Sequence, residues 1–184
     1  AAAGGACLSI LDFSQVRVMD YSCADEVIAK LLMRYVSPER PVDAYFLARG
    51  LQDHHLEAVE AVLERHGLLL AAEDAGREAR LLGPCTEIER ECWSALVRRR
   101  RARQEELAEA IGLLDDALDA IVQRFLGHRV AVALSEDVIC AVTEIGIISH
   151  QSSDIDREPA ESAIDEDVGR PDRIDYRNRP MTDD

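Results

Sequence analysis

The chain has 184 residues, 47% of them hydrophobic, and a formal net charge of −15 at pH 7. This length corresponds to one or two domains, and the apolar content suffices for a packed core. The charge is uneven, because residues 135–184 carry 14 acidic and 5 basic side chains whereas residues 85–134 carry 9 and 8. The composition therefore lacks the basic field that non-specific nucleic-acid binding usually needs, which counts against DNA binding without excluding it.

The sequence has no run of about 18 apolar residues that could span a membrane, and residues 1–6 lack the charged start and apolar core of a signal peptide. We therefore expect a soluble, cytoplasmic protein with no membrane partner. The five cysteines have no short paired spacing, which argues against a disulfide framework and favours small buried apolar side chains.

The residue types that act as catalytic groups or metal ligands do not occur in a recognisable sequence motif. His54 and His55 are adjacent on an expected helix and point in different directions, with no third ligand at a suitable spacing. We expect surface histidines and predict no metal site. A glycine-rich phosphate loop, a nucleophile elbow and a cysteine-histidine signature are also missing from the sequence. We therefore predict a protein that is not an enzyme and binds no cofactor.

The first segment is organised around residues 8–32, where an apolar strand leads through a polar turn into a helix. The strand begins at Leu8 and continues in alternation as far as Val18. The turn Asp20-Tyr21-Ser22 supplies a cluster of N-cap residues for the helix that follows. The free backbone amides at the start of that helix would favour an anion. The helix spans about 24–36 and ends before Pro38.

Strands and helices then alternate. A buried strand is expected over 43–50, a helix over 53–66 that Gly67 stops, and a third strand over 68–72. This alternation predicts an α/β fold with right-handed crossovers and a mainly parallel sheet. Because the first strand follows residues 1–6 at once, we expect upstream strands to be missing or very short. One sheet edge near residues 7–18 would then need a partner, in a homodimer or a heteromer.

The pattern of residues 10–32 resembles the core of a STAS domain, the fold of anti-sigma-factor antagonists. The family pattern has an apolar strand, then Asp-x-Ser-x-Val, an apolar pair, and Asp-Ser-Ser/Thr-Gly at the start of a helix. The residues that match it are Asp12, Ser14, Val16, Met19, Asp20 and Ser22. The resemblance covers about residues 7–82 and implies a STAS-like domain over residues 1–82.

The resemblance differs at the position where antagonists are phosphorylated. Tyr21 stands where the family has its switch serine, and Cys23 stands where it has glycine. Ser22, one position along, could be modified or could cap the helix. Tyr21, exposed at the helix start, would suit a protein interface, because tyrosine supplies contact area at low entropy cost. Asp20, Tyr21 and Ser22 are thus predicted to form a partner-docking turn.

The second segment predicts three helices followed by a hairpin. Thr86 caps a helix that ends in the arginine run 98–101, a short helix from Gln104 ends at Gly112, and a third helix covers 115–127. Strand-like runs at 129–134 and 138–142 flank a polar turn. This order resembles the winged helix-turn-helix domains of bacterial transcription regulators, which usually work in pairs. The resemblance implies such a domain over residues 85–146.

The third helix is poorly suited to read DNA. Its outward positions are predicted to be Asp115, Asp116, Asp119 and Gln123, and three carboxylates would be repelled by phosphates. Basic residues concentrate elsewhere, at Arg98, Arg99, Arg100, Arg101 and Arg103. These arginines could contact a phosphate backbone, or they could form a solvated helix terminus that complements the helix dipole. The third helix could equally be an interface for protein.

Periodicity is lost from about residue 149. Residues 149–184 are rich in Asp, Glu, Arg, Ser and Pro, which predicts a disordered acidic tail that solubilises the protein or orders on binding.

Two functions remain open. The first is a bacterial regulator with a STAS-like protein-interaction module and a winged-helix output module acting in transcription. The second is a structural or assembly adaptor in which both modules bind protein and DNA is not bound.

Overall fold

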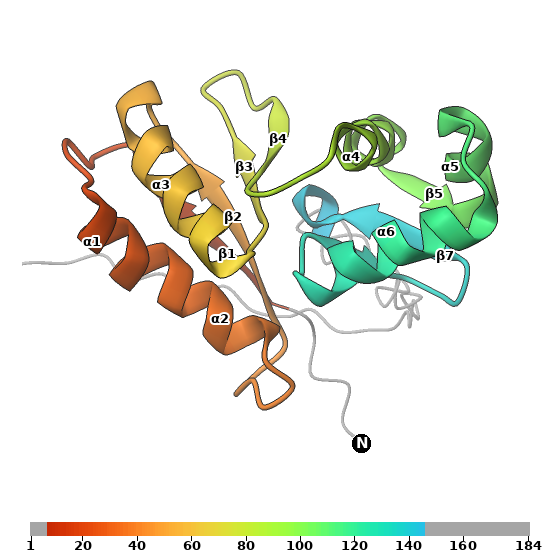
Figure 1. Cartoon of the computed structure of the whole chain (residues 1–184), viewed down its shortest axis with the longest axis horizontal. Helices are drawn as coiled ribbons and strands as arrows, with labels where there is room; N and C mark the ends of the chain where they lie inside the picture. The colour runs from red at the N-terminus through yellow and green to blue at the C-terminus, as the bar shows by residue number, and fades with distance from the viewer. Residues whose placement is uncertain (1–6, 146–184) are drawn as a thin grey trace, which may run out of the picture.

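The computed structural model describes residues 7–145, which form an α/β protein arranged in layers. A four-stranded sheet lies in the middle, with the helices of the first unit (residues 7–82) on one face and the second unit (residues 87–145) on the other (Figure 1). The strand order β1-β2-β3-β4 follows the order along the chain. The predicted tail, residues 149–184, lies outside the described residues.

The sheet of the first unit is mixed. Strands β1 (Cys7–Asp12), β2 (Ala44–Arg49) and β3 (Leu70–Glu73) are parallel, as predicted from the helical crossovers between them. Strand β4 (Ala79–Leu82) pairs with β3 in the antiparallel direction. Strand β4 was not predicted, because this short strand follows a polar turn over residues 74–78 and includes the charged Arg80. Among the described strands, β1 pairs only with β2 and forms one edge of the sheet.

Strand β1 is shorter than predicted. It ends at Asp12, and the alternating residues up to Val18 lie in a loop, where the Val18 side chain is 79% exposed. Periodicity in the sequence predicts that a segment can form a strand, but it does not show whether a neighbouring strand is present to pair with that segment. The buried Phe13 and Met19 hold the loop against the core that lies under the helices.

One long helical segment follows this loop. It consists of α1 (Tyr21–Ala24), a π-helical turn (Asp25–Ala29) and α2 (Lys30–Val36). Helix α3 (Asp53–His66) has the predicted bounds and ends at Gly67 in the left-handed conformation, at φ 62°. Both helical segments pack on the same face of the sheet (Figure 1).

The alternation of β2 distributes its side chains between two cores. Ala44, Phe46 and Ala48 face the core beneath α1, α2 and α3. Tyr45 and Leu47 face a second core that includes Trp93 and the inner residues of the second unit. Since the side-chain period of a strand is two, a fully buried strand such as β2 serves both layers. The second unit thus covers the face of the sheet that the helices leave open.

The second unit consists of three helices and a three-stranded antiparallel sheet. Its elements are α4 (Glu87–Arg99), β5 (Arg101–Arg103), α5 (Gln104–Ile111), α6 (Asp115–Gly127), β6 (Ala131–Ala133), β7 (Val138–Ala141) and a 3-10 turn (Val142–Glu144). The three helices and the hairpin agree with the sequence prediction. Strand β5, which pairs with β7 in the order β5-β7-β6, was not predicted, because three residues of which two are arginine carry no strand signal.

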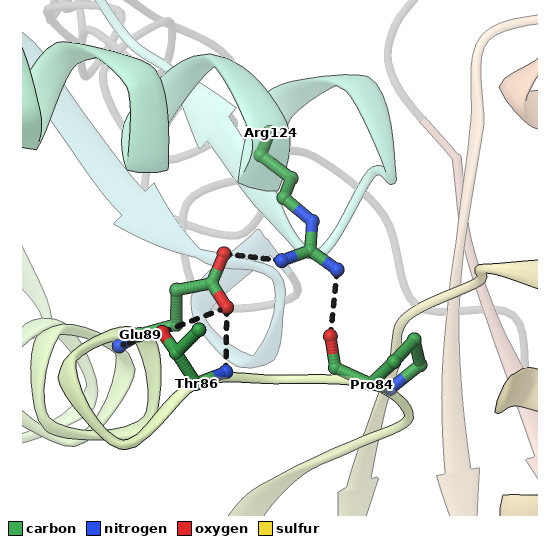
Figure 2. Close-up of polar contacts among 4 residues, drawn as sticks. All are labelled: Pro84, Thr86, Glu89 and Arg124. Carbon is green, nitrogen blue, oxygen red and sulfur yellow. Dashed lines mark hydrogen bonds and ion pairs between the residues drawn. The ribbon is translucent and has the colours of Figure 1, made fainter.

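A polar network holds the linker between the units against α4 and α6 (Figure 2). The buried Glu89 accepts hydrogen bonds from the Thr86 backbone amide at 2.7 Å and the Thr86 hydroxyl at 3.0 Å. Its other carboxylate oxygen pairs with Arg124 of α6, and that guanidinium also donates to the Pro84 carbonyl at 2.7 Å. The predicted cap at Thr86 is therefore part of a larger connection that fixes α6.

A second connection joins the end of α6 to the first unit. Arg129, only 7% exposed, donates through Nε to the Ala44 carbonyl at 2.6 Å and through Nη2 to the Asp43 carboxylate at 2.5 Å. Its guanidinium also lies 4.0 Å from the centroid of the Tyr45 ring. One buried side chain thus contacts three consecutive residues at the start of β2.

Candidate functional site

The predicted docking turn lies at the start of α1. The Asp20 carboxylate caps this helix and accepts a hydrogen bond from the Cys23 amide at 2.7 Å. The alternative in which Ser22 caps the helix is therefore wrong, because Ser22 lies inside the first turn with an exposed side chain. The predicted preference of this helix start for an anion is weakened for the same reason, since the Asp20 carboxylate already places negative charge there.

Tyr21 is 52% exposed, as predicted for an interface residue. Its hydroxyl donates to Glu57 of α3 at 2.9 Å, and this bond together with the Glu57 charge raises the pKa of the Tyr21 hydroxyl. Glu57 thus orients the Tyr21 ring, which the sequence could not show because the two residues are 36 positions apart.

A shallow cleft of about 380 Å³ lies beside the turn, between α1 and α3. It is lined by Tyr21, Ser22, Asp25, Glu26, Ala61, Val62 and Arg65. Two of its carboxylates already have partners, because Asp25 contacts His66 Nε2 at 2.7 Å and Glu26 pairs with Lys30. The hydrogen bond from His66 lowers the pKa of Asp25. The lining of the cleft thus combines an aromatic ring with apolar and charged side chains.

Two histidines fix the loop that leads to the turn. His54 Nε2 lies 2.9 Å from the Arg17 carbonyl, and the His54 and His55 rings meet edge to face at 4.1 Å. His55 is fully buried, so the prediction of a surface residue is wrong for His55 and right for the exposed His54. His55 Nδ1 accepts a hydrogen bond from the Gln52 amide at 3.2 Å, which places the imidazole at the start of α3.

We expect the stability of the protein to fall as the pH is lowered from 7 to about 5.5. Burial, with a further contribution from His54, lowers the pKa of His55, and burial also lowers the pKa of His128. The unfolded chain, in which histidine titrates near pH 6.5, therefore binds these protons first, so this stabilisation is present above about pH 6.5 and is lost below it. Urea unfolding at a series of pH values measures the effect. The change between pH 7 and 5.5 should be smaller in His55→Asn than in the wild type, and an equal change in both would contradict this role of His55.

A charged row runs along the carboxyl ends of the parallel strands. Asp12, Arg49 and Glu73 are the last residues of β1, β2 and β3, and they stand in register. Arg49 Nε donates to the Glu73 carboxylate at 2.7 Å, and Asp12 accepts from the Ser14 amide at 2.8 Å. This row was not predicted from the sequence, because only the sheet register brings its members together. Its side chains already bond to one another or to nearby backbone, so it is interpreted as structural.

The five arginines of the basic run are exposed, as predicted, but they do not form one surface. Arg99 and Arg101 share a shallow cleft with Glu106 and Glu109 of α5. Arg103 borders a different cleft of about 210 Å³, which it shares with residues of α5, α6 and the hairpin. The chain turns at Arg100, at φ 65°, between α4 and β5, and Ala102, between Arg101 and Arg103, is buried.

The outer face of α6 is acidic. Asp116, Asp119 and Gln123 are exposed, as predicted, and Gln123 donates a hydrogen bond to Asp119 at 3.5 Å. Asp115 is the first residue of the helix. Glu136 and Asp137 are exposed in the turn between β6 and β7. The helix that would have to enter a DNA groove therefore carries at least two carboxylates on its solvent face.

The remaining titratable residues are the cysteines and the side chains that could serve as metal ligands. Within residues 7–145, no group of three histidine, cysteine or acidic side chains could hold a metal ion. Cys92 and Cys140 are buried, as predicted, and burial raises the pKa of each thiol to about 11. Cys85 is half-buried, and Cys7 and Cys23 are exposed, contrary to the prediction. Cys7 is the first residue of the edge strand β1, and Cys23 lies in the short helix α1.

No helix between residues 7 and 145 has the length and apolar character needed to cross a membrane. Comparison of the chain with protein-family models, with curated proteins and with solved structures finds no match.

Proposed function

We propose that the protein is a non-enzymatic bacterial regulator of the cytoplasm, in which a STAS-like module takes input through protein contacts and a winged-helix module gives output in transcription. The observation that carries the proposal is the arrangement of the second unit. Helix α5 ends at Gly112 in the left-handed conformation, at φ 69°, and α6 begins three residues later. The antiparallel β6–β7 hairpin follows α6, which is the order expected of a helix-turn-helix with a wing.

The input surface in this proposal is the turn at Tyr21. Its exposed ring projects beside a cleft that contains both apolar and charged side chains. Tyrosine in such a position contributes large contact area to a protein interface. The output module is joined to the same sheet by Arg129, so a partner that displaces β2 or its flanking helices would also act on α6.

A second function, an assembly adaptor without DNA, is favoured by the acidic face of α6. Asp116 and Asp119 are exposed where a DNA-reading helix normally carries neutral or basic side chains. Such a face would be repelled by phosphates and would suit a basic protein surface. The two functions differ in whether duplex DNA is bound at all.

Salt-dependent DNA binding separates the two functions. We expect the full chain to bind a pool of random duplexes at low salt, through Arg99 and Arg101, with an affinity that falls steeply as salt rises from about 50 to about 200 mM. The variant Arg99→Gln/Arg101→Gln should bind more weakly, with a slope of log affinity against log salt that is about 2 smaller in magnitude, about 1 for each phosphate contact. Fluorescence anisotropy measures both quantities.

The matched control replaces two exposed arginines of the first unit, Arg34→Gln and Arg65→Gln, and should leave the slope unchanged. If no duplex binds at the lowest salt, the regulator on DNA is excluded and the adaptor remains.

Within residues 7–145, strand β1 pairs only with β2, and this sheet edge supports the further proposal that the protein works as a homodimer or a stable heteromer. Ile10 on this strand is 39% exposed, and an unpaired edge offers backbone groups to another strand. Light scattering of the full chain at micromolar concentration tests this proposal. A monomer mass, with no partner recovered by affinity purification from the host, would remove it.

A further inference from the structure

Strand β1, at the edge of the described sheet, has none of the usual protection against further pairing. Within Cys7–Asp12 there is no proline, no lysine and no charge before the last residue. Natural sheets commonly use prolines, charges or bulges to keep an edge from pairing with another chain. Ile10, in the middle of the strand, stands in register with the fully buried Leu47 but is itself 39% exposed. One further strand beside β1 would cover this side chain.

The backbone groups that face the edge suit an antiparallel strand of the same sequence. The Cys7 amide donates to the Asp43 carbonyl, so the odd-numbered residues of β1 bond to β2. The amide and carbonyl groups of successive residues point to opposite sides of a strand, so those of Leu8, Ile10 and Asp12 face away from β2. A second β1 that places Ile10 opposite Ile10 pairs each Leu8 with an Asp12 and uses all of these groups. No like charges then stand opposite each other within the paired strands.

The helical segment α1–α2 presents a second surface at the same edge. Helix α3 lies along one flank of this segment, where Tyr21 and Asp25 form hydrogen bonds with it. Cys23 and Val27 come two positions after these residues, about half a turn away, and so lie on the opposite flank. This flank is on the β1 side, because α3 links β2 to β3 and both helical segments cover the same face of the sheet (Figure 1). The Val27 side chain is 47% exposed there.

The charges on this flank are arranged symmetrically about Val27. Asp20 lies seven positions before Val27 and Arg34 seven positions after it, which is about two turns in each direction. Both side chains are exposed, and Arg34 forms no ion pair with another residue of 7–145. A second segment that runs in the opposite direction, with Val27 against Val27, brings each Asp20 beside the Arg34 of the other copy. The flank is therefore complementary in charge to itself.

We propose that a second copy of the chain docks along the β1 edge, related to the first by a two-fold axis perpendicular to the sheet. The two β1 strands pair in the antiparallel direction about Ile10, and the two four-stranded sheets become one. Such an axis keeps the helices of both copies on the same face, so the two α1–α2 segments lie side by side in opposite directions. The strand contact and the helix contact thus follow from one symmetry. This inference rests on the oligomer proposed above and specifies its partner and interface.

Sedimentation equilibrium of the full chain at micromolar concentration should give the mass of a dimer. Val27→Glu places two carboxylates against each other at the axis, so the dimer should dissociate at least about tenfold more readily. The matched control is Ile88→Glu on α4, because Ile88 is 46% exposed and the substitution introduces the same charge away from the β1 edge. This control should leave the dissociation constant of the dimer unchanged.

A double-mutant cycle tests the charge pairing between copies. Because the loss of one exposed ion pair has a small effect, the cycle reverses the charge with Arg34→Glu. This change should weaken the dimer about tenfold in the wild type but less than about threefold when combined with Asp20→Asn, which retains the helix cap. Within one chain the two residues are 14 positions apart, about 21 Å along the helical segment. Their coupling can therefore arise only between two copies.

Cross-linking tests the strand register. In a Cys7→Ser/Cys23→Ser background, which removes the exposed thiols, Ile10→Cys should form a disulfide-linked dimer on mild oxidation. Opposite residues of a hydrogen-bonded pair have Cα atoms about 5.5 Å apart, within the range of a disulfide. Ile88→Cys in the same background should not form a linked dimer.

A monomer mass at every concentration would overturn the proposed homodimer. A dimer that responds equally to Val27→Glu and Ile88→Glu, that lacks the coupling between Asp20 and Arg34, or that is not linked through Ile10→Cys would overturn this interface and leave the proposed oligomer to another surface. None of these results alters the DNA-binding measurement, which separates the regulator from the adaptor.

Discussion

Replacement of Arg129 by alanine is expected to lower the free energy of unfolding by about 2–4 kcal/mol, a large effect for one side chain. The variant loses the hydrogen bonds to Ala44 and Asp43 and the contact with the Tyr45 ring. It leaves the Ala44 carbonyl and the Tyr45 ring, both buried, without their partner. The expected loss is below that of a fully buried ion pair, because the Asp43 side chain is 46% exposed and partly solvated.

Urea unfolding followed by Trp93 fluorescence and by circular dichroism measures this loss. Trp93 is buried in the core that the second unit shares with the sheet, so its signal reports on that layer. Arg129→Lys should be destabilised as well, since it retains the charge but loses the planar fork that bonds two acceptors at once. The control Arg34→Ala removes an exposed arginine and should stay within about 0.5 kcal/mol of the wild type. If Arg129→Ala also changed the free energy of unfolding by no more than about 0.5 kcal/mol, the proposed role of Arg129 in joining the two units would be contradicted.

Replacement of Glu89 by alanine is expected to cost about 2–4 kcal/mol. The Glu89 carboxylate is the common acceptor for Thr86 and Arg124 (Figure 2), so its loss leaves the Arg124 guanidinium with only the Pro84 carbonyl and removes the acceptor of the Thr86 amide and hydroxyl. Helix α6 would then lose its ion pair with α4 and keep only the hydrogen bond from Arg124 to the Pro84 carbonyl of the linker. Glu91→Ala, at an exposed position of the same helix, is the matched control and should change stability by less than about 0.5 kcal/mol.

The pH dependence of Glu89→Gln should reveal the charge on this residue. Burial favours the neutral acid, but the hydrogen bonds from Thr86 and Arg124 outweigh burial and lower the pKa of Glu89 below its ordinary value. The unfolded state therefore takes up the proton first, near pH 4.3, so the stabilisation is present above that pH and is lost as the pH falls through the lower folded value. The stability difference between the wild type and Glu89→Gln should narrow under acid conditions. A difference that stays constant down to pH 3 would contradict this role of the charge.

Local sequence signals predicted several elements with the bounds that the structure shows. Helix α3 has them because its apolar periodicity ends at a glycine, and Gly67 adopts the left-handed conformation that a side chain disfavours. Helix α4 begins at the predicted cap because Thr86 and Glu89 satisfy each other's backbone groups within one turn. Such signals need only neighbours in sequence, which is why they can be read without the fold.

The predictions that were wrong or incomplete concern contacts between residues that are distant in the sequence. Strand β4 and strand β5 exist because β3 and β7 offer them partners, and neither short segment carries a strand signal of its own. His55 is buried because the loop before Tyr21 folds over the start of α3. Ser22 lost the predicted capping role to Asp20, a difference of two residues that local preference alone does not resolve.

In the candidate surfaces, too, the features set by neighbouring residues were predicted and those set by distant contacts were not. The exposure of Tyr21 and of the outer residues of α6 follows from helical periodicity, and the sequence predicted it. The hydrogen bond from the Tyr21 hydroxyl to the Glu57 carboxylate and the separation of Arg103 from Arg99 could not be predicted, since they depend on how helices and strands pack.

The sequence by itself determined the α/β class, the position of most helices and the uneven distribution of charge, because periodicity, caps and composition are properties of neighbouring residues. Only the tertiary structure decided how the two units are joined. The second unit covers the far face of the sheet through alternate residues of β2, and Arg129 and Arg124 bond to residues 85 and 40 positions away. Contacts across such separations depend on sheet register and helix packing, which no local pattern of residues encodes.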